Sequence, residues 1–385
     1  GNYRDLRENM TLHPVMGVYL SMVRNEKANP AENVRPDENY AREVLQLFSI
    51  GLYELDQSGS LKRDASGNPI ETYTQEDIVG LARAFTGWEA DRFVRGEPTH
   101  WRRPMKLLPD YHEPGAKRFL GLTIPAGTDG ATTLESALDH IAAHPNVGPF
   151  IGRQLIQRLV TSNPSPAYVY RVAQTFADDG NGQRGNLGAV IRAVLLDPEA
   201  RDASAVDSET FGKVREPIVR FVQWARTFRA RDPEGRYLLY DYSDPANKLG
   251  QSPSRAPSVF NFFRPGYVPP NTALGERGLV APELQITSES SVVGYANFML
   301  RVVRTGLGNR LVPNYGREQR LAGDPAALVA RLDLLLGGGQ LSEATRAAIE
   351  SALETIRNDD EVKRLARVHA AILMVMVSSD YLVQR

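Results

Sequence analysis

The sequence predicts a mainly α-helical protein, a multi-helix array of orthogonal and bundle-like packing with a small β-hairpin and one long irregular loop. Three observations lead to this fold class. Apolar residues recur at helical spacing in one segment after another, and stretches that alternate between polar and apolar residues are scarce. Residues 250–285 show no helical period and are rich in proline and aromatic residues, as a long loop would be.

The composition sets limits on the kind of protein. With 385 residues, 42% hydrophobic and 24% charged, the chain falls within the range of ordinary globular proteins. Lys plus Arg total 45 against 46 Asp plus Glu, mixed along the chain, so the sequence has no basic footprint for nucleic acid. Cysteine is absent, which excludes disulfides, thiolate metal sites and a cysteine nucleophile. The apolar run 370–377 is far shorter than the roughly 20 residues of a membrane span, so we expect none.

The first residues read as the continuation of a longer chain. Residue 1 is a glycine rather than an initiator methionine, and no signal peptide follows it. The first apolar positions, Tyr3, Leu6 and Met10, have no Ser, Thr or Asp cap ahead of them. We therefore expect that more chain preceded Gly1.

Residues 38–50 predict the first well-defined amphipathic helix. An apolar stripe runs from Tyr40 to Phe48 at about 100° per residue, and Gly51 is expected to end the helix. The next residues contain Ser-Gly and Gly-Asn-Pro turn signals, so 55–73 predicts a small hairpin.

Residues 74–88 predict a second amphipathic helix. Thr74 and Asp77 have the spacing of a cap in which the first-turn acid also suits the helix dipole. Small residues form a second flank that would let another helix approach closely: Gly80, Ala84 and Gly87. Further on, residues 117–127 predict a short strand.

The middle of the chain repeats the helical pattern. Helical spacing recurs in 132–144, 145–160, 166–179, 186–200 and 212–230. The acidic stretch 177–186 resembles a calcium loop but lacks the glutamate at the twelfth loop position, so it predicts a turn between two helices.

The C-terminal part predicts three helices that are antiparallel neighbours joined by short loops. Asp324 is an N-cap followed by proline, the glycines 337–339 stop that helix, and Ser342 caps the next one. A last helix is expected from about Asp360 into the final residues. We therefore divide the chain into a main helical domain, 1–323, and a C-terminal helical subdomain packed on it, 324–385.

Polar side chains at the margins of the first two helices are the first candidates for a site. Glu43 lies with Asn39 at an edge of the apolar stripe that is itself partly covered, and a carboxylate out of water needs a cation, hydrogen bonds or a proton. One interpretation is structural: Glu43 forms a buried ion pair with Arg83 or with a neighbour of Arg42. The other places Asn39, Glu43 and Arg83 in a polar pocket, with Glu43 as general base or metal ligand.

The histidines allow similar alternatives. His112 precedes the predicted strand, with Glu113 and Lys117 nearby, and it either anchors the loop by a hydrogen bond or performs acid/base or metal chemistry with Glu43. His140 and His144 are four residues apart, but Pro145 ends their helix and the glutamate of a zinc-protease motif is missing. A capping or loop-packing role is the better interpretation for His144.

Several long blocks of this sequence resemble one bacterial family. The blocks are ENYAREVLQLFSIGL, YTQEDIVGLARAFTGW, HEPGAKRFLG, HPNVGPFIGRQLIQRLV and LGQSPSRAPSVFNFF, in this order. They are similar to the family catalogued as domain of unknown function 1800, over nearly the whole chain. The family-matching polar positions are Asn39, Glu43, Asp77, Arg83, His112, Lys117, His144 and Gln251.

The resemblance implies a largely helical protein that is usually exported, hence periplasmic or extracellular, and no established activity. It also implies a helical segment ahead of Gly1, which either was removed or exists as a separate piece. Family members are often encoded beside a second exported protein of the alkaline-phosphatase-like superfamily, so an envelope partner is expected.

Two functional hypotheses follow. The first is a binding or assembly component of the cell envelope that works with a partner protein or surface polymer through residues 250–285. Its expected binding residues are Asn39, Lys117, Gln251, Arg255, Phe262, Phe263 and Arg264. The alternative is an envelope hydrolase with a carboxylate-based, metal-dependent or metal-free polar pocket, in which Glu43, His112 and Arg83 are catalytic. Neither a cofactor nor a particular metal is indicated by the sequence.

Overall fold

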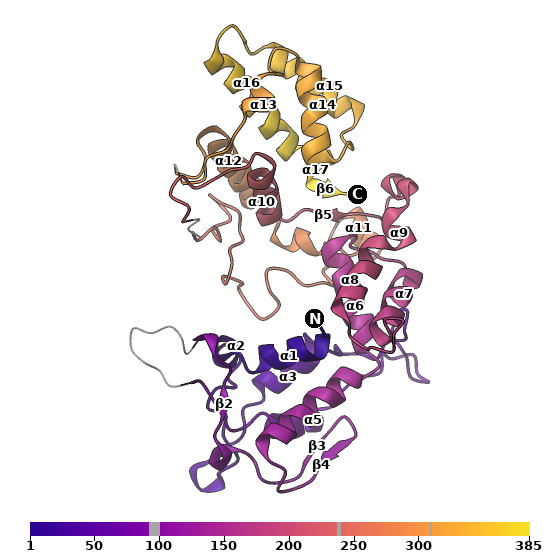
Figure 1. Cartoon of the computed structure of the whole chain (residues 1–385). Helices are drawn as coiled ribbons and strands as arrows, with labels where there is room; N and C mark the ends of the chain where they lie inside the picture. The colour runs from indigo at the N-terminus through magenta and orange to yellow at the C-terminus, as the bar shows by residue number, and fades with distance from the viewer. Residues whose placement is uncertain (92–100, 237–239, 309) are drawn as a thin grey trace. The chain divides into compact units, whose positions relative to one another are not determined.

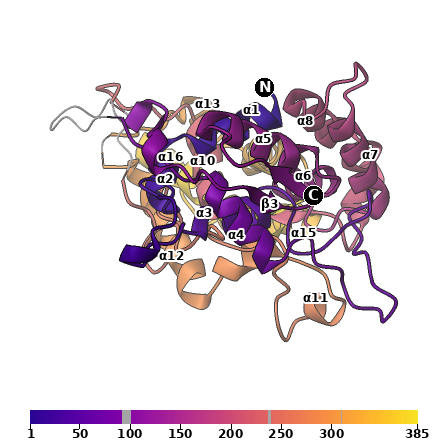
Figure 2. The ribbon, with the colours of Figure 1, turned by 90° about the horizontal axis from the view of Figure 1, so that it is seen from below.

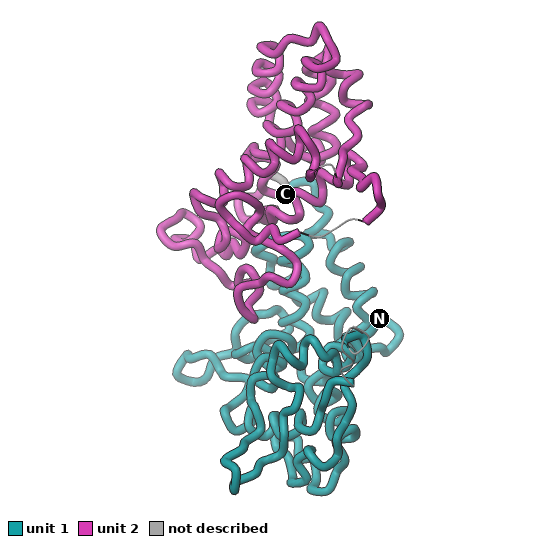
Figure 3. The backbone as a smooth tube through the Cα atoms, turned by 90° about the vertical axis from the view of Figure 1, so that its left-hand side faces the viewer, with its two compact units in different colours: residues 1–205 teal, residues 206–385 magenta. Residues whose placement is uncertain are grey.

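The protein was analysed as a computed structural model that describes residues 1–91, 101–236, 240–308 and 310–385. Its residues group into two compact units, unit 1 (Gly1–Ala205) and unit 2 (Val206–Arg385), which Figure 3 colours teal and magenta. Helices dominate both units, and the described strands form only two-stranded antiparallel pairs. The mainly α-helical fold class is therefore confirmed. The division at residues 323 and 324 falls inside unit 2 and stays a prediction.

Unit 1 consists of helices joined by short hairpins (Figure 1). Its helices are α1 (Tyr3–Thr11), α2 (Pro14–Tyr19), α3 (Asn39–Gln46), α4 (Gln75–Ala84), α5 (Gly130–Ala143), α6 (Val147–Leu159), α7 (Pro166–Ala177), α8 (Leu187–Leu196) and α9 (Pro198–Arg201). Its strands are β1 (Trp88–Glu89), β2 (Lys106–Leu107), β3 (Lys117–Phe119) and β4 (Leu122–Ile124). β1 pairs with β2, and β3 pairs with β4.

The caps of unit 1 show which sequence signals were sufficient. The capping box of α4 is present, with Thr74 and Asp77 satisfying each other's backbone N–H groups. Asp77 has a second role that the sequence did not reveal, because its Oδ1 accepts the N–H of Leu120 at 2.6 Å. At the start of the chain, Asn2 caps α1 by accepting the N–H of Arg4 at 2.8 Å, so the expectation of an uncapped first helix was wrong.

Helix α3 is shorter than its apolar pattern predicts. It ends at Gln46 rather than near residue 50. The carbonyl of Leu45 accepts the N–H groups of both Ile50 and Gly51, each at 3.0 Å, and the Ser49 hydroxyl donates to the Val44 carbonyl. These bonds occupy the last helical carbonyls one turn early, and Gly51 at φ 73 supplies the left-handed residue that the turn requires.

The small-residue flank of α4 is used, but by a strand rather than by a helix. A Cβ built on Gly80 would lie 1.7 Å from the carbonyl oxygen of Arg118 in β3. Figure 2 shows α4 and β3 next to each other. The prediction of a close approach is correct, but the predicted type of partner is wrong. Small residues permit a neighbouring backbone to come close, and they do not determine whether that neighbour is a helix or a strand.

The expected hairpins and turns of unit 1 are confirmed. Residues 53–71 form antiparallel bridges, including Tyr53 with Glu71 and Leu55 with Leu61. Strands β3 and β4 fall within the predicted stretch 117–127. Asp178 and Asp179 accept backbone N–H groups of the turn between α7 and α8, as expected for a helix-connecting loop.

Unit 2 is a helical assembly around one aromatic and aliphatic core. Its elements are β5 (Lys213–Val214), α10 (Pro217–Thr227), α11 (Ala273–Glu276), η5 (Pro282–Ile286), α12 (Glu289–Thr305), α13 (Gly316–Gln319), α14 (Pro325–Leu332), the π-helical turn η6 (Asp333–Gly337), α15 (Glu343–Glu354), α16 (Glu361–Val377), α17 (Ser379–Leu382) and β6 (Val383–Gln384). Helix α16 packs against α12, α14 and α15. In the core, the rings of Phe221 and Phe298 meet edge to face with centroids 5.6 Å apart.

The C-terminal helices begin where the sequence predicts. Asp324, Ser342 and Asp360 cap α14, α15 and α16 through their side chains. The last helix does not continue to the end of the chain, however. It stops at Val377, and the hydroxyl of Ser378 accepts the N–H of Tyr381 to start the separate helix α17. No helix in the described parts of the chain combines the length and the apolar character that a membrane crossing requires.

Candidate functional site

Glu43 lies on the buried side of α3. Only 8% of its surface is exposed, and its Oε2 atom has no hydrogen-bond partner within the described residues. Burial raises the pKa of its carboxyl group, and the positive charge of Arg42 opposes this shift. Asn39 is half-buried one turn earlier, where its backbone N–H donates to Asp37. Across the described residues, no hydrogen bond joins the Asn39 side chain to Glu43.

Arg83 lies apart from this carboxylate. Its side chain is exposed on α4, and among the described residues no ion pair connects it with Glu43. The charge that acts on Glu43 is that of Arg42, on its own helix. The buried bridge between Glu43 and Arg83 is therefore not seen among the described residues, and their place in a common pocket stays a prediction.

His112 and Lys117 are both buried and lie within electrostatic reach of each other. The Nδ1 of His112 lies 3.0 Å from the Thr86 carbonyl, while its Nε2 has no partner among the described residues. Lys117 in β3 is completely buried, and its Nζ also lacks a hydrogen-bond partner there. Burial lowers the pKa of both groups, and the charge of Lys117 lowers that of His112 further.

This histidine and lysine form a polar centre that is separate from Glu43. Glycines on two sides allow the imidazole to fit, since a Cβ on Gly87 or Gly130 would lie 3.1 or 3.2 Å from its side chain. Burial lowers the pKa of Lys117, which is the direction of change found in lysines that act as a base or a nucleophile. One ring nitrogen of His112 anchors the loop at Thr86, and the other has no partner among the described residues. The expected chemical role of His112 stays a prediction.

His140 and His144 have local structural roles. His144 accepts the N–H of Asn146 at 3.2 Å through Nδ1, which confirms its role in the turn between α5 and α6. His140 Nε2 lies 2.9 Å from the Leu120 carbonyl. In the described residues, no three His, Asp or Glu side chains are grouped as ligands for a metal ion.

The long loop 250–285 is largely irregular, with only α11 inside it and η5 at its end. Phe263 is buried and Phe262 is half-buried, so neither ring is freely displayed. Arg264 is exposed, and its guanidinium lies 4.5 Å from the centroid of the Phe260 ring. Arg255 is exposed and forms a long ion pair with Asp241 at 3.5 Å. Of the loop residues expected to bind, the two arginines are therefore the exposed ones.

Gln251 has a structural explanation. It is 2% exposed, and its Oε1 accepts the N–H of Ile218 in the first turn of α10 at 3.3 Å. Its Nε2 donates to Glu216, the residue before that helix, at 2.7 Å. Gln251 therefore caps α10 from a distant part of the sequence and fixes one end of the long loop.

A hollow of about 750 Å³ in unit 2, here named the basic hollow, brings together residues that the sequence analysis did not single out. It is lined by Arg229, Arg231, Arg304, Thr305, Gly306, Val312, Pro313, Asn314, Tyr315, Gly316, Gln319, Leu365 and His369. No acidic residue lines it, and the three guanidinium groups have no hydrogen-bond or ion-pair partner among the described residues.

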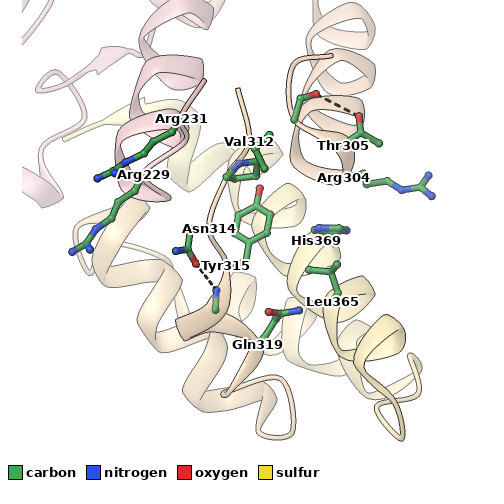
Figure 4. Close-up of a pocket in the computed structure, with 13 residues that line it drawn as sticks. Arg229, Arg231, Arg304, Thr305, Val312, Asn314, Tyr315, Gln319, Leu365 and His369 are labelled. Atoms are coloured by element: carbon green, nitrogen blue, oxygen red, sulfur yellow. Dashed lines mark hydrogen bonds between the residues drawn. The ribbon is translucent and has the colours of Figure 1, made fainter. Parts of the chain in front are cut away.

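The floor of the basic hollow is held firmly. Val312 and Arg231 exchange backbone hydrogen bonds at 2.9 and 3.0 Å, and the N–H of Asn314 donates to the Phe228 carbonyl at 2.8 Å. Below them, the Tyr315 hydroxyl accepts from Trp224 Nε1 at 2.9 Å and lies 3.1 Å from the Val303 carbonyl. Figure 4 shows Arg229 and Arg231 on one side of this segment and Arg304 with His369 on the other.

The positive charge of the basic hollow comes from its arginines. The ring of His369 meets that of Tyr315 edge to face at 5.5 Å, and burial together with the nearby charge of Arg304 lowers the pKa of His369 to about 4. His369 is therefore neutral at pH 7. The hollow presents two separated patches of positive charge, Arg229 with Arg231 and Arg304 alone, which can bind anionic groups.

Arg229 also adopts a costly backbone conformation. It sits just past the C-terminus of α10 at φ 49, in the left-handed region where glycine is usual. Its N–H donates to the Arg226 carbonyl at 3.1 Å, and the next N–H, of Ala230, donates to Ala225 at 2.8 Å. An arginine at the glycine position of this motif was the one local signal in the sequence that could have pointed to the hollow.

Comparison with known proteins gives a family without an assigned activity. Neither curated proteins nor solved structures provide a significant match to this chain. The family described as "Protein of unknown function (DUF1800)" matches residues 1–383. The match covers both compact units, together with the buried Glu43, His112 and Lys117 and the basic hollow. The chain therefore belongs to the DUF1800 family.

Proposed function

We propose that this DUF1800 protein is an extracytoplasmic binding and assembly component of a bacterial envelope, and that its basic hollow receives an acidic segment of a partner protein. The observation that carries the proposal is the presence of three guanidinium groups around one hollow without a counter-ion among the described residues. By contrast, the half-buried Arg331 of the same unit is paired with Glu318 at 2.7 Å.

The spacing of the charges favours an extended ligand over a compact anion. Arg229 and Arg231 lie across the 312–316 segment from Arg304, so the guanidinium groups do not converge on one point (Figure 4). A single phosphate or carboxylate would engage one side only. A chain that carries several carboxylates can reach both sides, and its backbone can pair with the side chains of the exposed Asn314 and the half-buried Gln319.

The left-handed Arg229 supports the same function. A glycine there would avoid a cost of about 1 kcal/mol. Strained residues of this kind are concentrated at sites where the side chain is needed. Arg229 has no ion-pair partner among the described residues, and its exposed side chain is available to a ligand outside the chain.

The test is the binding of a fluorescently labelled hexaglutamate peptide to the whole chain, followed by anisotropy at low salt. We expect saturable binding that falls at least about tenfold when Arg229, Arg231 and Arg304 are all replaced by Gln, since several exposed charges contribute up to about 1 kcal/mol each. The matched control is Arg320→Gln, an exposed arginine of the same unit that lies outside the hollow.

Each outcome has a clear meaning. Equal loss in the triple variant and in Arg320→Gln would show nonspecific attraction and overturn the proposal. Failure of the peptide to bind the unmodified protein would overturn it as well. Tighter binding of a polyanionic carbohydrate than of the peptide, lost in the triple variant, would replace the protein partner by a surface polymer.

The docking role of the long loop remains part of this proposal. Arg255 and Arg264 are two of its exposed charged residues, and replacing both by Ser should weaken capture of an envelope partner without changing stability. The extracytoplasmic location is proposed from the family resemblance. Fractionation of cells that express the natural full-length gene would test it, and recovery of the protein only in the cytoplasm would contradict it.

A second candidate function is supported by the unpartnered polar atoms of unit 1. Lys117 is a buried amine whose pKa is lowered, it lies within electrostatic reach of His112, and His112 Nε2 has no partner among the described residues. Screening the protein with acyl, phosphoryl and glycosyl ester probes, together with Lys117→Met and Glu43→Gln, tests it. Turnover that is lost in Lys117→Met while the fold persists would support an enzyme. Metal analysis of the protein and of Glu43→Gln addresses its metal-dependent form.

A further inference from the structure

A second cavity continues from the basic hollow along the surface of unit 2. This cavity, here named the α12/α16 groove, has a volume of about 490 Å³ and lies between α12 and α16. It shares Arg304, Thr305, Leu365 and His369 with the basic hollow. An apolar groove and a patch of positive charge therefore form one continuous surface.

The walls of the groove are regular. On α16, the lining positions start at Val362 and follow the spacing of one helical face through Leu365, Ala366, His369 and Ala370 to Met374. At the ~1.5 Å rise per residue of an α-helix, this face is about 18 Å long. Leu300 of α12 forms the opposite wall and is 40% exposed, while Val362 is 78% exposed. Leu365, Ala370 and Met374 between and beside them are half-buried, so the strip is partly exposed along its length. A contiguous apolar strip that remains accessible is typical of an interaction site.

We infer that the α12/α16 groove receives an amphipathic helix of the partner protein, with acidic residues at its C-terminal end in the basic hollow. The inference rests on the proposed function, since it names the form of the acidic segment. Two antiparallel or parallel helices with a groove between them provide the geometry for a third helix. The small side chains of Ala366 and Ala370, one turn apart, permit close approach of that helix.

Charge determines the direction of the bound helix. Arg304 stands at the junction of groove and hollow, and the remaining arginines lie beyond it in the hollow. No acidic side chain lines either cavity. Because the C-terminus of a helix carries partial negative charge, its end and its acidic side chains are best placed at Arg304. Without the charge of Arg304, the apolar groove could bind the helix in either direction.

An acyl chain and a second copy of this protein are the competing occupants. Pockets for small apolar ligands usually surround most of the ligand, whereas this groove is open and formed by only two helices. An acidic helix would contact the apolar wall and also form ion pairs with the arginines. An uncharged surface of a second copy would leave those arginines without partners. The charge complementarity favours the helix.

The test uses three designed peptides of about 16 residues, slightly longer than the groove at ~1.5 Å per residue. The first carries a leucine stripe at helical spacing and glutamates in its last turn. The second has the same composition in scrambled order, and the third carries lysines in place of the glutamates. We expect the striped acidic peptide to bind the whole protein at least about tenfold more tightly than either of the others.

Matched protein variants locate the binding site. Ala366→Glu places a charge in the groove at an exposed helical position, and Ala348→Glu makes the same change on the exposed face of α15. The first variant should abolish the preference for the striped peptide, and the second should leave it unchanged. Circular dichroism of both variants checks that α16 and α15 remain folded.

The outcomes separate the inference from the proposed function. Equal binding of striped and scrambled acidic peptides, still lost in the triple arginine variant, would overturn the groove inference and leave the proposed function standing. Failure of hexaglutamate to bind the unmodified protein as well would overturn both. Oleate binding or self-association that disappears in Ala366→Glu, without a preference for the striped peptide, would assign the groove to another occupant and overturn the inference.

Discussion

Two hollows of about 750 Å³, one in each unit, differ in how their charges are balanced. The hollow of unit 1, here named the mixed-charge hollow, lies between α7 and α8 and contains Arg171, Arg192, Asp179 and Asp197. Arg171 binds Asp197 through two hydrogen bonds of 2.7 Å each. The basic hollow of unit 2 contains three arginines and no acid. A balanced hollow stabilises its own unit, whereas an unbalanced hollow keeps its charges available to a ligand.

The largest loss of stability should follow Gly306→Ala, which distorts the turn that forms one wall of the basic hollow. Gly306 holds φ 68, and a Cβ there would lie 2.4 Å from the Leu311 carbonyl oxygen. We expect unit 2 to lose about 3 kcal/mol of unfolding free energy. Urea unfolding followed by tryptophan fluorescence measures the loss, and hydrogen exchange assigns it to unit 2.

The control for this change is Gly308→Ala, two residues further along. Gly308 has a similar φ of 58, but a Cβ there would meet open space. Only the backbone cost of about 1 kcal/mol should appear. Equal effects of the two substitutions would show that the close approach to Leu311 does not matter.

Acid should weaken unit 2 through His369. Burial and Arg304 lower its pKa in the folded state from 6.5 to about 4, so the unfolded chain binds a proton first. Its contribution to stability is therefore complete above pH 6.5 and is lost as the pH falls toward 4, on the order of 2 kcal/mol after allowance for solvent screening. Unfolding of His369→Gln at several pH values measures this contribution as the difference from the unmodified protein.

A bound acidic ligand should reverse part of this effect. Its carboxylates offset the charge of Arg304 and raise the pKa of His369, so binding near pH 5 should take up protons. Calorimetric titration with hexaglutamate in buffers of different ionisation enthalpy detects the uptake. No uptake in the unmodified protein would place the ligand away from His369.

Mirror substitutions in the two hollows should have opposite consequences. Asp197→Ala removes the partner of Arg171 and the cap of α9, so unit 1 should lose about 1–2 kcal/mol. Arg304→Gln removes an exposed charge without a described partner and should change stability by less than about 0.5 kcal/mol. Thermal unfolding compares the two, and an equally large loss for Arg304→Gln would reveal a compensating charge in unit 2.

The smallest effect should be a gain. Arg229→Gly places the preferred residue at a left-handed position and should stabilise unit 2 by about 0.5–1 kcal/mol. The same change should weaken hexaglutamate binding about threefold, as expected for one exposed charge. Destabilisation instead of a gain would show that the Arg229 side chain supports the fold.

The sequence was most informative where the interacting groups are close along the chain. The capping box of Thr74 and Asp77, the caps of the C-terminal helices and the turn at 177–186 all depend on residues within a few positions of one another, and all are present. The early end of α3 was missed because the bonds that Ser49 and Gly51 make compete with an apolar pattern that continues past them.

The candidate site was less predictable, because its residues meet only in three dimensions. Helical spacing identified Glu43, and the loop before the predicted strand together with the family resemblance identified His112 and Lys117. All three are buried with an unpartnered atom in the described structure. The sequence could not show that Glu43 and His112 lack direct contact, or that Gln251 caps α10 from 35 positions away. The basic hollow combines the end of α10, the end of α12 and one face of α16, which no local pattern connects.

The close approach at Gly80 has a consequence for the evolution of the family. Because Arg118 of β3 occupies the space where any side chain would begin, even alanine is excluded unless the strand moves. A descendant of this fold can therefore change that position only together with a displacement of β3, which would also shift the neighbouring Lys117. Among DUF1800 sequences, the residue aligned with Gly80 should thus mark which lineages have kept this arrangement around the buried lysine.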